Sequence, residues 1–213
     1  MKIVLFGASG VIGSRIAQEA LWRGQEVTAV VRDPAKMALT HERLTTIAGD
    51  VRDPATVARV AAGHDIVASA IGPSQAEAVS VIVEAARALL EGTRRAGVRR
   101  LIVVGGAASL EVAPGVPLLE TPDFPQAWKP VATAARDALA IYRAEPEGLD
   151  WTFLSPAALI APGERTGHYR TGAEQLLTDS ARNSQISAED YAIAFVDEIE
   201  HPQHPRSRFT VAY

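Results

Sequence analysis

The sequence predicts an α/β fold with a doubly wound, mainly parallel sheet, and two features of the chain indicate it. Short β-branched runs alternate with longer helical stretches, which is the pattern of repeated βαβ units. Most of these runs are near-continuous stretches of Ile, Val, Leu and Ala, as expected where helices cover both faces of a sheet. The 213 residues, 47% of them hydrophobic, suffice for one domain with at most a small appendage.

Each predicted strand is a short apolar run: Lys2–Phe6, Glu26–Val31, Leu44–Ala48, Asp65–Ala70, Arg100–Val104, Asp150–Leu154 and Arg208–Val211. The predicted helices lie at about Val11–Arg23, Pro54–Ala62, Ala76–Ala96, Val131–Ala144 and Ala188–Ile199. Asp53 and Pro54 mark a helix start, because Asp caps a first turn and Pro suits its first position. Gly97 is expected to close the helix before it.

Two connections lack this periodicity and are rich in Pro and Gly, namely residues 106–128 and 155–186. Long irregular connections in a compact domain are uncommon and tend to be functional. Both leave the carboxyl ends of predicted strands, where open α/β sheets bind ligands. We therefore expect a single domain over residues 1–213, to which residues 106–128 and 155–213 contribute a small C-terminal substrate-binding lobe.

The composition excludes several classes of function. With 21 basic and 25 acidic residues, the net charge of -4 disfavours a nucleic-acid partner. The lack of cysteine excludes a disulfide framework, a thiolate metal site and a cysteine nucleophile, so redox chemistry would need a cofactor. The first apolar run is too short for a signal peptide, and no later run approaches the roughly 18 residues of a membrane span. We expect a cytoplasmic protein with no membrane partner.

The strongest local signal is the glycine segment Gly7-Ala8-Ser9-Gly10-Val11-Ile12-Gly13, between the first predicted strand and helix. Gly7 allows a sharp turn, Gly10 lets backbone N–H groups approach a pyrophosphate, and Gly13 lets the helix pack closely on the strand. The phosphates would lie at the positive end of the helix dipole. The segment is neither a Walker loop nor a nucleophile elbow, because no Gly-Lys-Ser/Thr follows and Ser9 directly precedes a glycine. We expect this Rossmann-like segment to bind a dinucleotide.

The second predicted strand ends where the adenosine ribose should lie, about twenty residues after the glycine segment. Arg32 occupies its tip and Lys36 lies one turn further on. Because a guanidinium suits a 2′-phosphate through its charge and planar fork of donors, we expect NADP(H) rather than NAD(H). The alternative is that Arg32 pairs with Asp33 or Asp53 and selects nothing.

Two further strand ends are expected to line the cofactor. Asp50, followed by Val51, is placed to bind the adenine amino group after the third strand. Ala70, Ile71 and Gly72 follow the fourth strand and would line the middle of the cofactor.

The chain resembles the atypical short-chain dehydrogenase/reductases, in particular the NAD(P)H-binding group around NmrA-like proteins and flavin/biliverdin-IXβ reductase. The resemblance rests on the glycine segment and on Val31-Arg32-Asp33, Gly49-Asp50-Val51, Val103-Val104-Gly105-Gly106-Ala107-Ala108-Ser109-Leu110, Asp150-Trp151-Thr152-Phe153-Leu154-Ser155-Pro156 and Ile186-Ser187-Ala188-Glu189-Asp190-Tyr191-Ala192. It spans almost the whole chain, and residues 162–167 are more particular to small bacterial members. It implies a Rossmann-like fold, a nicotinamide cofactor and a cofactor contact at Pro156.

One departure from the family narrows the expected chemistry. Standard short-chain dehydrogenases use a Tyr-x-x-x-Lys pair, in which the lysine lowers the pKa of the phenol for proton transfer. The residues four positions after Tyr142, Tyr169 and Tyr191 are Pro146, Ala173 and Phe195. Related flavin/biliverdin reductases manage without the pair, taking a proton from solvent or from a serine after the fifth strand. Ser109 is the catalytic candidate here, although it lies two or three residues beyond the family's serine.

Other candidates have both a functional and an ordinary interpretation. Lys129 is a catalytic candidate that would orient the cofactor ribose or an anionic substrate, or else a solvated cation at a helix start. Trp128 and Phe124 would form an apolar wall for an aromatic substrate, or else pack in the core. His168 and Tyr169 would capture substrate from the polar loop of residues 163–169, which a surface turn would equally resemble.

The expected function is an NAD(P)H-dependent oxidoreductase acting on a planar conjugated acceptor such as a flavin, a quinone or a polycyclic aromatic intermediate. The alternatives are a non-enzymatic, NmrA-like sensor of the NADP(H) ratio, or a biosynthetic tailoring enzyme, including an oxygenase, that reuses the fold on an aromatic substrate. No metal site is expected, because His201 and His204 have no third ligand in view. A homodimer is the default assembly.

Overall fold

The computed structural model describes residues 1–72, 78–146 and 148–213. Its centre is an eight-stranded sheet in the order β10-β12-β8-β5-β4-β1-β2-β3. Every neighbouring pair in this sheet is parallel except β10 and β12. The strands are β1 (Lys2–Phe6), β2 (Glu26–Val31), β3 (Leu44–Ala48), β4 (Ile66–Ser69), β5 (Arg100–Val104), β8 (Asp150–Ser155), β10 (Arg170–Gly172) and β12 (Ser207–Ala212). The predicted Rossmann-like α/β fold is confirmed.

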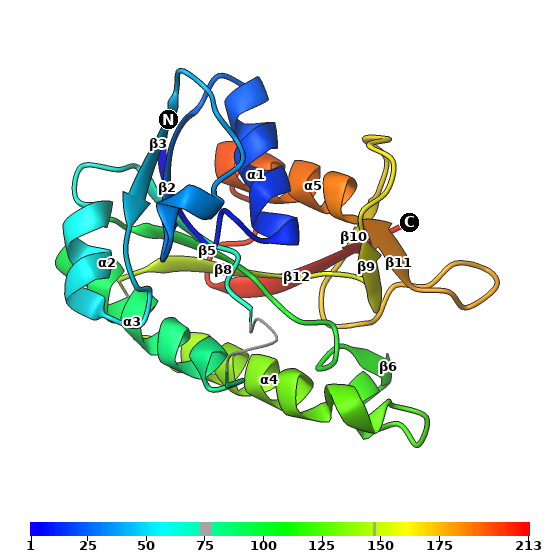
Figure 1. Cartoon of the computed structure of the whole chain (residues 1–213). Coiled ribbons are helices and arrows are strands. Elements are labelled where there is room, and N and C mark those ends of the chain that lie inside the picture. Colours follow the sequence, from blue (N-terminus) through cyan, green and yellow to red (C-terminus); the bar gives the residue numbers. More distant parts are fainter. Residues whose placement is uncertain (73–77, 147) are drawn as a thin grey trace.

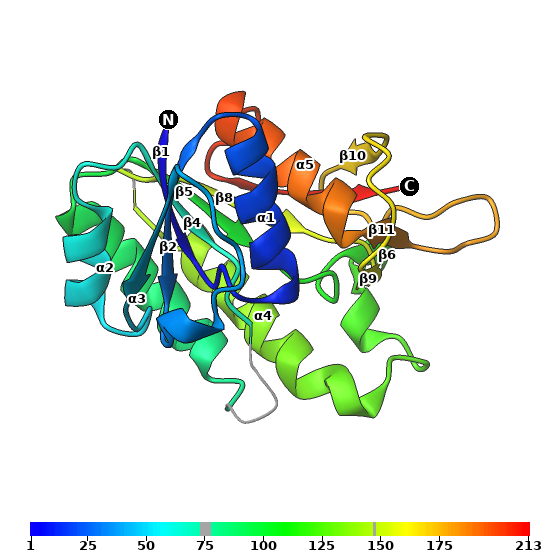
Figure 2. The same cartoon turned by 45° about the horizontal axis from the view of Figure 1, so that its top comes forward.

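Helices cover both faces of this sheet (Figures 1 and 2). The pair α1 (Val11–Trp22) and α5 (Ala188–Glu200) covers one face, and α2 (Pro54–Ala61), α3 (Val81–Arg95) and α4 (Lys129–Arg143) cover the other. Alternate residues of a strand enter the two cores, so that Ile3 and Leu5 face α1 and α5 while Val4 and Phe6 face the other layer. Burial on both faces explains why the strands are continuously apolar.

Local chemistry explains some of the helix boundaries. The carboxylate of Asp53 caps α2, accepting from the N–H groups of Ala55 at 3.0 Å and Thr56 at 3.1 Å. Gly97, at a φ of 73°, closes α3 as predicted. The start of α3 differs from the prediction, because residues 78–80 are not helical and residues 76 and 77 lie outside the described part of the chain. The prediction began too early because the apolar pattern of the sequence continues upstream of the first helical residue, Val81.

The two irregular connections contain strands too short to show a period in the sequence. In the first, β6 (Glu111–Ala113) and β7 (Val116–Pro117) form a hairpin followed by the 3₁₀ turns η2 (Leu118–Glu120) and η3 (Gln126–Trp128). In the second, β9 (Leu159–Ala161) pairs with β11 (Gln185–Ser187), and β10 joins the main sheet. These elements gather at the end of the sheet toward which β8 and β12 run (Figure 1). From residue 188 onward, α5 and β12 belong to the main layers.

No helix in the described ranges has both the length and the apolar character needed to cross a bilayer.

Candidate functional site

The order of the strands places a binding crevice at the carboxyl ends of β1 and β4. From β1 the sheet grows through β2 to β3 on one side and through β4 to β5 and β8 on the other, so the winding reverses between β1 and β4. Two backbone hydrogen bonds bring the neighbouring loops together, from Gly7 N to the Val30 carbonyl at 3.3 Å and from Ala70 N to the Phe6 carbonyl at 2.9 Å. The glycine segment therefore lies between the ends of β2 and β4.

The three glycines of this segment have different roles. Gly7 has a φ of 81°, and a Cβ there would lie 2.6 Å from the Ala70 carbonyl oxygen. A Cβ on Gly13 would lie 2.1 Å from the Gly7 carbonyl oxygen, so the turn and the helix contact both require glycine. A Cβ on Gly10 would lie 3.4 Å from that oxygen, which is an ordinary contact. Gly10 is exposed, so its missing side chain leaves room for a ligand and is not needed by the fold.

The amino end of α1 suits an anion. Gly10 stands at the N-cap and provides no side-chain hydrogen bond, and the first turn contains no acidic residue. The starts of α3 and α4 also lack a side-chain cap, whereas α2 and α5 are capped by Asp53 and Ser187. What sets α1 apart is that it follows the glycine turn directly at the end of β1. The backbone N–H groups and positive dipole of α1 thus remain directed at the crevice, as pyrophosphate binding requires. The cradle fits a dinucleotide.

The adenosine end of the crevice is basic. Arg32 and Lys36 are both exposed just beyond β2. Asp50 is bound by Arg52, with Nη2 to Oδ2 at 2.5 Å and Nε to Oδ1 at 3.0 Å. These hydrogen bonds, with a smaller contribution from the charge of Arg32, hold the pKa of Asp50 below its ordinary value. Asp50 therefore stays ionised beside Arg52 and Arg32, and its contact with adenine stays a prediction.

Asp33 and Asp53, the two carboxylates considered as alternative partners of Arg32, both cap helical turns, and whether Arg32 selects the cofactor or pairs with one of them stays a prediction. Asp33 accepts from the Ala35 N–H at 3.1 Å, and Asp53 caps α2. Of the other predicted lining residues, Val51 is buried in the core, whereas Ala70 and Ile71 are half-buried and Gly72 is exposed.

At the nicotinamide end, close packing explains the unusual sequence after β5. A Cβ on Gly105 would lie 2.1 Å from the Phe153 ring, and one on Gly106 would lie 2.9 Å from the Cβ of Ala135 on α4. The close packing against Phe153 and α4 therefore requires glycine at both positions directly after β5. Pro156 is buried directly after β8.

Ser109 is held by Arg208, a residue that the sequence analysis did not select. The Arg208 Nη1 donates to the Ser109 Oγ at 2.8 Å, and Nη2 donates to the Ser109 carbonyl at 3.2 Å. Arg208 also forms an ion pair with Glu174. The alternation of β12 could have revealed Arg208, because Phe209 and Val211 face the α1 side and Arg208 must therefore face α4.

The aromatic candidates separate in the structure. Phe124 is 8% exposed and packs in a small lobe core with Ala108, Leu119 and Ala132. Trp128 is 59% exposed and directly precedes Lys129, the first residue of α4. Of the two rings, Trp128 is the one that a substrate could cover. The substrate roles of Trp128 and Phe124 and the catalytic role of Lys129 stay predictions.

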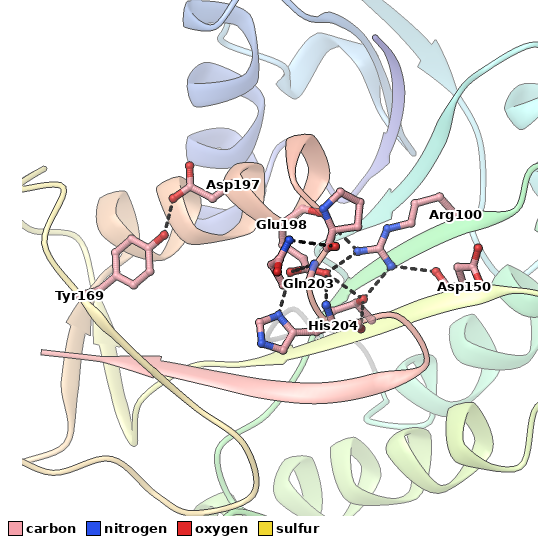
Figure 3. Close-up of polar contacts among 9 residues, drawn as sticks. Arg100, Asp150, Tyr169, Asp197, Glu198, Gln203 and His204 are labelled. Atoms are coloured by element: carbon pink, nitrogen blue, oxygen red, sulfur yellow. Dashed lines mark hydrogen bonds and ion pairs between the residues drawn. The ribbon is translucent and has the colours of Figure 1, made fainter.

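The polar loop of residues 163–169 is tied to α1 and α5. Arg165 binds Glu19 at 2.9 Å, and the buried carboxylate of Asp190 accepts from Thr166 N and Gly167 N, both at 2.8 Å. The hydroxyl of Tyr169 donates to Asp197 (Figure 3).

Burial and Asp197 together raise the pKa of Tyr169, so its phenol stays protonated. The loop thus lies on the α1 side of the sheet, and Ser109 is held from the α4 side, so the structure does not bring Tyr169 to Ser109. His168 is exposed, and its role in substrate capture stays a prediction.

A second polar cluster lies at the opposite, amino edge of the sheet. Glu198 accepts from Arg100 at 2.8 Å, from the Gln203 N–H at 3.1 Å and from His204 Nδ1 at 2.8 Å (Figure 3). Arg100 and Asp150 begin β5 and β8, so this cluster is remote from the crevice. The residues described contain no group of three His, Cys, Asp or Glu able to hold a metal ion.

A family model described as NAD(P)H-binding matches residues 7–202 of the chain. The chain belongs to this NAD(P)H-binding family. The match extends from the glycine segment through α5 and thus includes both lobe connections. Family and geometry agree on a nicotinamide cofactor, and the predicted family resemblance is confirmed at this level.

Three bacterial proteins match the chain over nearly its whole length. The chain is 40% identical over 214 residues to the uncharacterized protein YwnB of Bacillus subtilis, covering 99% of this chain and 98% of YwnB. It is 34% identical to a solved Streptococcus pneumoniae structure named a "putative NADH-flavin reductase", with a TM-score of 0.87 over 100% of this chain and 99% of that one. A Burkholderia pseudomallei structure named a "putative exported protein" is 56% identical, with a TM-score of 0.91 over both full chains.

Proposed function

We propose that this protein is a reductase that uses NADPH in preference to NADH and acts on a planar conjugated acceptor such as a flavin or a quinone. The observation that carries the proposal is the cradle at the amino end of α1, where Gly10 leaves the backbone accessible beside a basic adenosine end. The 34% identical protein from Streptococcus pneumoniae, named for NADH-flavin reduction, supports the same class of reaction.

The tyrosines of the chain favour an acceptor that needs no phenol as proton donor. Tyr142 and Tyr191 are buried, and burial raises the pKa of both. The hydroxyls of Tyr169 and Tyr213 are bound to the carboxylates of Asp197 and Asp190. A conjugated acceptor spreads the charge that it gains over its rings and therefore depends less on a strong acid than an isolated ketone does.

In the proposed mechanism the chain binds the cofactor and the acceptor, orients them relative to each other and excludes water from the site. The nicotinamide cofactor supplies a hydride when bound. The glycine segment and the amino end of α1 would hold the pyrophosphate, and Arg32 with Lys36 would contact a 2′-phosphate. Trp128 and the lobe cover the acceptor, which keeps the reacting groups aligned in a dry site. We place this reaction in the cytoplasm, where reduced nicotinamide cofactors are regenerated.

The test is NADPH consumption by the purified protein with riboflavin, FMN and menadione as acceptors, together with calorimetric affinities for NADP⁺, NADPH and NADH. Turnover on one acceptor and tighter binding of NADPH than of NADH are expected. Equal affinity for the oxidised and reduced cofactor, without turnover on any acceptor, would replace the reductase by the sensor of the NADP(H) ratio.

The NADPH preference has its own variant. Arg32→Ala should weaken NADPH binding by roughly 10- to 100-fold, as loss of a charged hydrogen bond implies, and leave NADH binding nearly unchanged. Arg59→Ala is the matched control, because Arg59 is an exposed arginine in the last turn of α2, away from the crevice. Equal weakening of both cofactors by Arg32→Ala would contradict the preference.

A further inference from the structure

Arg208 is a buried cation directed at the segment that leaves β5. Its side chain is 2% exposed. It pairs in register with Phe153, whose ring belongs to the core beneath α3 and α4, so both side chains face that layer. Burial of a guanidinium is costly unless charged and polar partners surround it. Its partners are therefore informative.

Those partners leave an excess of positive charge beside Ser109. Arg208 and Arg143 share a single carboxylate, that of Glu174, with Arg143 Nη2 at 2.7 Å from Oε1. Burial acts to raise the pKa of Glu174, but the hydrogen bonds from Arg208 and Arg143 outweigh it and keep the carboxylate ionised. Two guanidinium groups against one carboxylate leave the cluster with a net charge of about +1.

The direction of the hydrogen bond also matters. Because Arg208 donates to the Ser109 Oγ, the hydroxyl hydrogen of Ser109 remains available to another acceptor. A cation at hydrogen-bond distance stabilises the deprotonated oxygen, which makes a hydroxyl a better proton donor. Ser109 is half-buried and follows the carboxyl end of β5, the neighbour of β4 in the sheet, and its contact with Arg208 on β12 directs it to the side of β5 away from β4.

We propose that Arg208 is a positioning residue that orients Ser109 and enables it to protonate the reduced acceptor. This inference rests on the proposed function. The acceptor gains a hydride from the reduced cofactor and a proton from the Ser109 Oγ, so it is reduced by two electrons while the cofactor is oxidised. Ser109 recovers its proton from water, and Arg208 balances the charge of the oxygen in between.

The effect of Arg208 can be measured without cofactor or substrate, because the natural chain contains no cysteine. The variant Ser109→Cys introduces a single thiol at this position, and the pH dependence of its alkylation by iodoacetamide gives the thiol pKa. The control is Ser184→Cys, since Ser184 is also half-buried but its Oγ accepts from a neutral donor, the Ala158 N–H at 3.0 Å.

The expected midpoint of alkylation is at least about one pH unit lower for Ser109→Cys than for Ser184→Cys. Adding Arg208→Gln to Ser109→Cys should raise it by a similar amount, and adding Arg208→Lys should restore part of the shift. Because Arg208→Gln risks unfolding, Arg143→Gln provides a second route. Arg143 is 49% exposed, so its loss should leave the fold intact, and it should raise the midpoint because Glu174 then neutralises Arg208 alone. Equal midpoints at both thiols, or a midpoint unmoved by Arg143→Gln, would overturn the inference.

Measurements of NADPH turnover connect the thiol pKa at position 109 to the proposed reaction. Ser109→Ala and Arg208→Lys should each lower kcat on the accepted acceptor with little change in NADPH affinity, and the double variant should be no slower than Ser109→Ala. Additive losses would mean that Arg208 is merely structural. If the natural protein consumes no NADPH with any acceptor, the proposed function and this inference fail together. If it turns over but the midpoints do not shift, the inference alone fails.

Discussion

The two edges of the central sheet differ in how far their polar groups are bound within the protein. At the amino edge, Arg100 and Glu198 are buried and bound to each other, and their neighbours Thr152 and His204 complete the cluster. The carboxyl edge has internally bound groups as well, such as Asp190 and Arg208, but its helix start at Gly10 has no side-chain cap and Lys36 is exposed. A buried paired group stabilises the fold, whereas an uncapped helix start leaves N–H groups available to a ligand. We therefore predict that the amino edge is structural and that the carboxyl edge binds the ligand.

The largest expected effect lies at the amino edge. Glu198→Gln leaves the buried guanidinium of Arg100, whose pKa is already lowered by burial, without its counter-charge. The free energy of unfolding should fall by about 3–5 kcal/mol, the usual cost of breaking a buried ion pair. Urea unfolding measures the free energy of unfolding, and the cofactor affinity of the folded fraction should not change. Asp137→Asn is the control, because Asp137 is 50% exposed and pairs with the exposed neighbour Arg136 on α4. A loss of cofactor affinity in the folded Glu198→Gln variant would contradict a purely structural role for the amino edge.

At the carboxyl edge, Gly10→Ala should separate binding from folding. The added Cβ meets only the Gly7 carbonyl at ordinary distance but enters the space of the pyrophosphate. Cofactor affinity should fall at least roughly 10-fold, or about 1.4 kcal/mol, with a smaller loss of stability. Gly13→Ala is the matched variant, because its Cβ would lie 2.1 Å from the same oxygen and must disturb the fold. If the cofactor binds Gly10→Ala with unchanged affinity, its phosphates do not lie at the amino end of α1.

Asp190 connects the lobe to the main layers and makes stability depend on pH. Burial acts to raise the pKa of Asp190, but hydrogen bonds from Thr166, Gly167 and Tyr213 outweigh it and hold the pKa below its ordinary value. A carboxylate with a lowered folded-state pKa contributes stability above its unfolded pKa, near 4, and loses it as the pH falls further. Asp190→Asn should therefore be less stable at neutral pH and should lose less stability between about pH 5 and pH 2. If the midpoint temperature of unfolding falls equally with pH in the natural protein and in Asp190→Asn, this prediction is wrong.

The smallest expected effect concerns the exposed ring of Trp128. Trp128→Ala should leave the free energy of unfolding within about 0.5 kcal/mol, because the side chain is 59% exposed. The KM for the acceptor should rise several-fold if the ring covers the substrate. Trp22→Ala is the matched control, since Trp22 is 65% exposed at the far end of α1. Equal KM values in the two variants would remove Trp128 from the site.

The sequence predicted the main layers closely because their signals are local. The bounds of β1, β2, β3 and β5 agree with the prediction, and Asp53 and Gly97 stand at the helix ends expected of them. The lobe strands were missed, because segments of two or three residues do not repeat a period. The glycine segment lies between β1 and α1 as expected, because Gly7 and Gly13 each satisfy a steric need of the turn, and Gly10 leaves room for the predicted cofactor.

Other parts of the candidate site could not be predicted, because they depend on contacts between distant segments. Ser109 meets Arg208 across 99 positions of the chain, and Thr166 meets Asp190 across 24. No periodicity or motif encodes such a pairing. The same holds for Phe124 and Trp128, which look alike in the sequence but differ in burial.

By itself, the sequence determined the fold class, the nicotinamide-binding crevice and the lack of a tyrosine–lysine pair, since these depend on residue type and on spacing along the chain. Only the tertiary structure decided which polar groups are paired internally and which face the crevice. Pairing is set by the packing of helices and strands that are remote in sequence, and it is this packing that joins Arg208 to Ser109.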